Sequence, residues 1–101
     1  MRMLMHVTLP HETFNAAVKD GTVETKMKRI LEELKPEATY YTATRGHRSA
    51  YMIIDLQDTS QIPHYAEPWF LQFNADCEFH PVMVPEDLGK AGLLGLGKKW
   101  A

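Results

Sequence analysis

Five side chains of the types used in acid–base chemistry share one face of the predicted strands: His6, Tyr51, Asp55, Glu78 and His80. Glu78 and His80 are two residues apart, so on a strand they point the same way. A neutral imidazole beside a carboxylate can accept a proton near pH 7, and the carboxylate fixes its tautomer. We expect a proton-transfer site with His6 and Asp55 at its centre, Glu78 or His80 on the other side of His6, and Tyr51 as a hydrogen-bond donor.

Two other interpretations of this cluster stay open. Buried polar groups need hydrogen-bond partners, so the same residues are typical of a polar network inside a subunit interface. Two histidines and two carboxylates are also suitable metal ligands, but the chain has no His-x-x-x-His or Cys-x-x-Cys spacing. We therefore predict neither a metal nor a cofactor.

A second group of residues is suited to holding a substrate. Arg45 and His47 belong to a basic turn, which favours capture of a carboxylate and is equally typical of a solvated hairpin tip. Tyr41, on the preceding strand, is a further hydrogen-bond donor. Trp69 is one of several aromatic residues at helical spacing, which favours a core position and also allows an aromatic pocket. The single cysteine, Cys77, has no nucleophile signature and is expected to be an inert thiol.

The elements that must position these residues follow from hydrophobic periodicity. Alternation predicts four strands, over residues 2–9, 38–45, 49–57 and 76–84. Helical spacing predicts helices within 11–35, interrupted at Asp20-Gly21-Thr22, and over 62–73, where Pro68 predicts a kink or restart near Glu67. The order β-α-β-β-α-β is the ferredoxin-like α+β pattern: a four-stranded antiparallel sheet with helices on one face. An extra C-terminal helix is expected to begin at Pro85.

In this topology the first and third strands are central neighbours, and the fourth lies beside the first. The face away from the helices carries Leu4, Ile53 and Val82 among its polar residues. It is too apolar to be freely solvated and too polar for a plain core, so a C2 homodimer is expected to cover it. The glycine-rich tail, residues 85–101, is too weak a helix former to stand alone and should dock on the body or on the partner.

Several stretches resemble known families. Met3-Leu4-Met5-His6-Val7, Gly46-His47 and Asp76-x-Glu78 are similar to segments of muconolactone isomerases. Asp20-Gly21-Thr22, Ala66-Glu67-Pro68-Trp69-Phe70 and Pro85-Glu86-Asp87-Leu88 resemble an uncharacterised family of short bacterial proteins. These resemblances imply a dimeric α+β barrel, a fold shared by lactone isomerases, cofactor-free monooxygenases, haem enzymes and proteins without known chemistry. The fold does not imply the activity.

Composition bounds the remaining possibilities. The chain has 101 residues, fitting one domain with a core over 1–84 and a tail over 85–101. A net charge of −2 disfavours nucleic acid as a partner. A single cysteine, no apolar run long enough for a membrane span and no signal-peptide pattern favour the cytoplasm. Two functions remain: a cofactor-independent enzyme acting on a small metabolite by proton transfer, or a non-enzymatic binding or accessory dimer.

Overall fold

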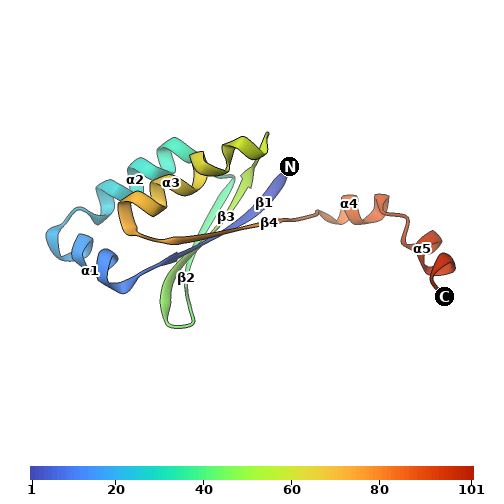
Figure 1. Ribbon diagram of the computed structural model, residues 1–101, viewed down its shortest axis with the longest axis horizontal. Helices are drawn as coiled ribbons and strands as arrows, with labels where there is room; N and C mark the ends of the chain where they lie inside the picture. The colour runs from blue at the N-terminus through green and yellow to red at the C-terminus, as the bar shows by residue number, and fades with distance from the viewer.

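A computed structural model describes residues 1–101 as a four-stranded antiparallel sheet with helices on one face (Figure 1). The strands lie in the order β2-β3-β1-β4. Their bounds are β1 (Arg2–Leu9), β2 (Ala38–Thr44), β3 (His47–Asp55) and β4 (Asp76–Pro81). The central pair is β1 and β3, and β4 pairs with β1. The ferredoxin-like α+β arrangement predicted from the sequence is confirmed.

Three helices cover the sheet: α1 (His11–Asp20), α2 (Val23–Leu34) and α3 (Ile62–Phe73), the last preceded by a 3-10 turn, η1 (Thr59–Gln61). Gly21 ends α1 with a φ of 82°, a left-handed conformation that glycine adopts without strain. The predicted break between α1 and α2 is therefore present. Of the predicted kink or restart near Glu67, the restart is wrong, because α3 is continuous through Pro68. Pro68 cannot donate a backbone hydrogen bond within the helix. Trp69 and Phe73 are both buried, and their packing keeps the helix on the sheet despite this missing bond.

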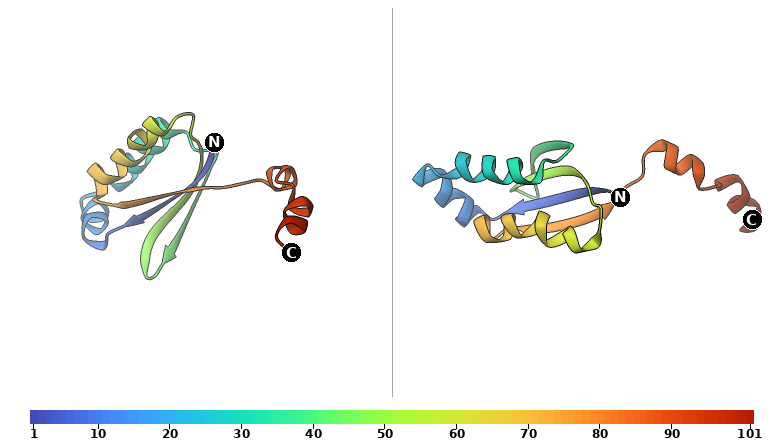
Figure 2. Two further views of the ribbon diagram at one scale, coloured as in Figure 1. Left: turned by 45° about the vertical axis from the view of Figure 1, so that its right-hand side comes forward. Right: turned by 90° about the horizontal axis from the view of Figure 1, so that it is seen from above.

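The core lies between the sheet and these helices. Along β1 every second side chain is buried, and the alternate side chains are partly exposed. The residues predicted to face the helices do so. Those fully buried or nearly so on the strands are Met3, Met5, Val7, Leu9, Ala50, Met52 and Ile54, and Cys77 and Phe79 pack against them. The opposite face of the sheet, which we call the open face, carries no helix (Figure 2).

The β2–β3 hairpin closes through a two-residue turn. Arg45 and Gly46 have φ values of 54° and 79°, and Thr44 pairs with His47. Two consecutive positive φ values match the twist of the flanking strands, which is why such turns favour glycine. This short turn fixes which residues of β2 and β3 lie opposite each other.

The C-terminal arm, residues 85–101, forms two short helices that extend away from the body (Figures 1 and 2). They are α4 (Pro85–Lys90) and α5 (Leu93–Lys99). Every residue of the arm is exposed. The prediction that the tail docks on its own body is wrong for this chain, because residues 82–84 lead it outward from the sheet. Docking on a partner stays a prediction. None of the helices has both the length and the apolar character needed to cross a membrane.

Candidate acid–base site on the open face

His6 lies in the middle of β1, a central strand, and its side chain projects from the open face. The strand register places Tyr51 of β3 opposite His6 on one side and Glu78 of β4 opposite it on the other. Three neighbouring strands thus bring together three residues that are far apart in the sequence. The prediction that His6 and Glu78 are neighbours is confirmed.

The imidazole and the carboxylate are hydrogen-bonded. His6 Nδ1 lies 3.1 Å from Glu78 Oε2, and His80 Nε2 lies 3.8 Å from the same oxygen. The hydrogen bond from His6 is the main reason that the pKa of Glu78 is below its ordinary value, and both imidazoles contribute when charged. An ionised carboxylate only accepts hydrogen bonds, so Nδ1 of His6 carries the hydrogen and donates it to Glu78. In neutral His6, Nε2 is then the basic nitrogen.

Tyr51 covers the His6 ring. The two rings are stacked with centroids 4.3 Å apart and planes inclined by 2°. The Tyr51 hydroxyl lies 3.4 Å from Thr44 Oγ1, on the neighbouring strand. Only 12% of the His6 side chain is exposed, and its Nε2 is buried without a hydrogen-bond partner. The site therefore contains a base whose reactive nitrogen has no hydrogen-bond partner and is shielded from solvent.

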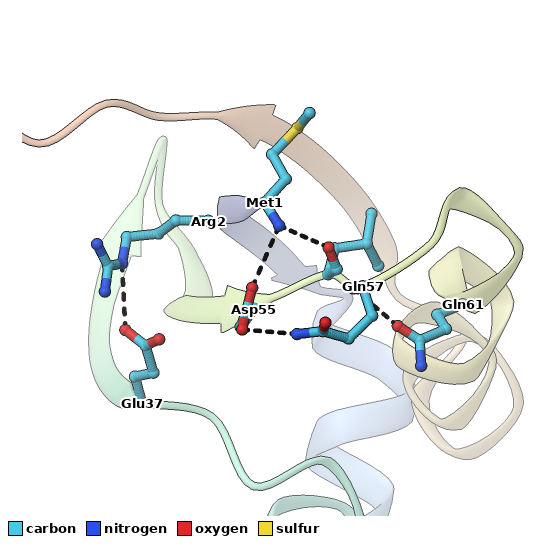
Figure 3. Close-up of polar contacts among 7 residues, drawn as sticks. Met1, Arg2, Glu37, Asp55, Gln57 and Gln61 are labelled. Atoms are coloured by element: carbon cyan, nitrogen blue, oxygen red, sulfur yellow. Dashed lines mark hydrogen bonds and ion pairs between the residues drawn. The ribbon is translucent and has the colours of Figure 1, made fainter. Parts of the chain in front are cut away.

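Asp55 does not belong to this site, and the predicted His6–Asp55 pair is wrong. Asp55 lies opposite Arg2, at the far end of β3 from the hairpin. Its carboxylate accepts hydrogen bonds from the Met1 amino group at 3.2 Å and from Gln57 Nε2 at 2.7 Å (Figure 3). Asp55 and Tyr51 are four residues apart on one strand and share a face, which is why alternation alone could not distinguish them.

The predicted substrate-binding residues are dispersed. Tyr41 lies on the face of β2 that is turned toward the helices, and burial raises the pKa of its hydroxyl. Trp69 is wholly buried in the core, on the other side of the sheet from His6. Arg45 and His47 lie at the hairpin end, where the His47 ring stacks on His11 with centroids 4.4 Å apart. The structure does not bring these four residues together around His6.

Two hollows that sequence reasoning missed lie on the helix side. A groove of about 850 Å³ separates α2 from α3, and its walls include Lys26, Arg29, His64, Glu67 and Leu71. Only the packing of the two helices forms this groove, so the sequence alone could not indicate it. A smaller hollow of about 270 Å³ lies between β2 and α1; its lining includes Tyr41, Phe14 and Arg48. The Arg48 guanidinium lies over the Phe14 ring and donates to Asn15. Neither hollow includes His6, Tyr51 or Glu78.

The remaining polar chemistry is limited. No group of three or more His, Cys, Asp or Glu side chains is arranged to hold a metal ion. Cys77 faces the helices, and burial, with a smaller contribution from Asp76, raises the pKa of its thiol to about 12. A thiol with so high a pKa is almost wholly protonated near neutral pH, and the thiolate is the nucleophilic form.

Comparison with known proteins adds the family and no activity. No curated protein matches the chain. A family described as a domain of unknown function, DUF3303, matches residues 1–94, which include the sheet, the three helices that cover it and most of the C-terminal arm. The chain belongs to the DUF3303 family.

Proposed function

We propose that the protein is a homodimer that binds a small metabolite on the open face of its sheet and transforms it by proton transfer without a cofactor. The observation that carries the proposal is the His6–Glu78 hydrogen bond, which leaves His6 Nε2 buried without a partner. Buried polar atoms normally have a partner, so an orphaned imidazole nitrogen is a reason to look for a ligand.

The chemistry would be proton abstraction next to a carbonyl group and return of the proton to another carbon. His6 Nε2 accepts the proton, and the Glu78 carboxylate stabilises the imidazolium that forms. Because the same proton is returned, the reaction is an isomerisation and needs no oxidant. Access to Nε2 requires the Tyr51 ring to tilt away from His6.

The dimer is part of the proposal because the open face is half apolar. Leu4, Ile53 and Val82 are partly exposed there beside the polar residues. A second copy would shield them and exclude water from His6, which strengthens the electrostatic effects on which proton transfer depends. We also propose a cytoplasmic location, supported by the single cysteine.

One observation favours a second candidate, a non-enzymatic binding or accessory dimer. His6 Nε2 is covered by the protein's own atoms, and neither hollow on the helix side reaches it. In this case the His6–Tyr51–Glu78 cluster only stabilises the sheet and its interface.

The variant His6→Gln separates the two functions, because glutamine keeps hydrogen-bonding capacity and cannot titrate. His80→Gln is the matched control, since His80 lies on the same face but is more than half exposed. A panel of small keto acids and lactones would be screened against the protein by NMR. Under the enzymatic proposal, His6→Gln abolishes binding or turnover of a hit and leaves the dimer intact, and His80→Gln has a smaller effect. Loss of stability without any change in the screen would instead support the accessory dimer.

A further inference from the structure

The C-terminal arm exposes large apolar side chains to solvent. They are Leu88, Leu93, Leu94, Leu96 and Trp100, all more than 40% exposed. Its helices have six and seven residues and contain three glycines between them. Isolated helices of this length are unstable in water, so these two need an apolar surface to pack against.

The chain as a whole is more extended than a compact monomeric domain of its length. Its radius of gyration is 17.2 Å, whereas a compact domain of this length has about 13 Å. It exposes 7119 Å², whereas a compact monomer of 11.6 kDa is expected to expose about 5,800 Å². A stable interface between two proteins buries about 1,200–2,000 Å² in total. The excess surface of two chains is therefore sufficient to build a dimer.

The direction of the chain points to another molecule. The Val82 amide still donates to the Arg2 carbonyl, so pairing with β1 continues just past β4. Val84 is extended, with φ −84° and ψ 163°, and the Asp87 carboxylate accepts from its amide to begin α4. The arm thus continues outward beyond the end of β4 and lies apart from the body (Figure 2).

Charge favours a second copy as the partner. Residues 1–84 contain eight Lys and Arg against eleven Asp and Glu, whereas residues 85–101 contain three against two. The body is therefore net acidic and the arm net basic. On the open face Glu78 has only histidines as partners, and Lys98 and Lys99 lie at the end of the arm without an acidic partner.

We propose that the arm of each chain packs on the open face of a second copy, with its leucines over Leu4 and Ile53. The inference rests on the proposed dimer and names the segment that makes it. It also makes the His6 site composite, because the cover that excludes water from Tyr51 and His6 comes from the other chain. The arm is then an exchanged element that both closes the site and holds the dimer together.

The first test compares two equally exposed leucines in the full chain. Leu94 on the arm and Leu71 on α3 are 78% and 77% exposed. Sedimentation equilibrium should show that Leu94→Ser weakens the dimer at least about tenfold, and that Leu71→Ser leaves it unchanged. A dimer that tolerates Leu94→Ser would overturn the arm exchange and leave the proposed dimer standing. A monomeric parent chain would overturn both.

The second test identifies where the arm lies. In a Cys77→Ala background, one preparation carries Ile53→Cys and a second carries Leu94→Cys, and the two are mixed with a short bismaleimide crosslinker. The expected product is a covalent heterodimer of the two variants. The control replaces Ile53→Cys by Lys28→Cys, which lies on the outer side of α2, and its crosslinking should be several-fold slower. Equal rates would overturn the proposal. A further preparation carries both cysteines in the same chain. Crosslinking that occurs only within one chain of that preparation would also overturn the proposal, because it would place the arm on its own body.

Discussion

The imidazole of His6 lies flat against the phenol ring of Tyr51, with 4.3 Å between the centroids and 2° between the planes. The pair bridges the two central strands of the sheet, and the Glu78 hydrogen bond extends it to a third strand. The ring that could accept a proton is thus fixed on both sides by neighbours on adjacent strands. Tyr51 covers one face of this ring, whose Nε2 is buried without a partner.

Replacing Tyr51 by leucine should uncover His6. We expect Tyr51→Leu to lower the free energy of unfolding by about 0.5–1.5 kcal/mol through loss of the ring pair. It should also speed the modification of His6 by diethyl pyrocarbonate, measured by mass spectrometry. Tyr40→Leu is the control, since Tyr40 lies opposite Tyr51 on β2 but is largely exposed. If His6 reacts equally fast in both variants, Tyr51 is not the cover.

Glu78 gives a dependence on pH whose sign is defined. Its pKa in the folded protein lies below the ordinary glutamate value of 4.5, chiefly because His6 donates a hydrogen bond to it. A carboxyl whose pKa is lowered by folding stabilises the fold above its unfolded pKa, and this contribution is lost as the pH falls through the folded pKa. Carbon-13 NMR should show Glu78 titrating below 4.5 in the parent chain and closer to 4.5 in His6→Gln. An identical titration in both proteins would contradict the hydrogen bond.

The faces of the strands could be predicted from the sequence, but the register between β1 and β3 could not. Alternation assigned His6, Tyr51, Asp55 and Glu78 to the open face, and all four lie there. The β2–β3 register is set locally by the Arg45-Gly46 turn. By contrast, β1 and β3 are separated in the chain by two helices and a strand, so no turn aligns them. A shift of four residues along β3 leaves every side chain on the same face of the sheet. For this reason Asp55, and not Tyr51, was predicted to lie beside His6.

The position of the arm was beyond sequence reasoning for a different reason. Its leucines and glycines indicate a segment that needs an apolar surface to pack against. The same composition would be expected whether that surface belongs to the same chain or to another. Only the extended backbone at Val84 shows the direction in which the arm leaves the sheet. The groove between α2 and α3 was equally hidden, because it depends on how far apart two helices lie.

Cys77 should be chemically silent in the folded protein. Burial raises its pKa to about 12, so almost no thiolate is present at pH 8. We expect iodoacetamide to leave the native protein unmodified and to alkylate the same thiol promptly in strong denaturant. As the chain has one cysteine, the mass shift reports on Cys77 alone. Prompt alkylation of the native protein would mean that the thiol is accessible.

Two methionines of the chain form a matched pair for testing the core. Met52 is fully buried beneath the helices, and Met83 is 67% exposed. Met52→Ala should lower the free energy of unfolding by about 2–5 kcal/mol, as large-to-small core substitutions do. Met83→Ala should change it by no more than about 0.5 kcal/mol, as is usual at the surface. Denaturant unfolding curves measure both, and similar losses would contradict the placement of the core.

The alternation of β1 has a genetic consequence. Buried and open-face residues alternate one by one along this strand, so the face on which each side chain lies depends on its exact position in the strand. Deleting a single codon between Met5 and Leu9 would turn the residues beyond it to the opposite face, exchanging core and open-face side chains. Removing two adjacent codons would keep both faces and only shorten the strand. Length variation in this segment should therefore be tolerated, if at all, in steps of two residues.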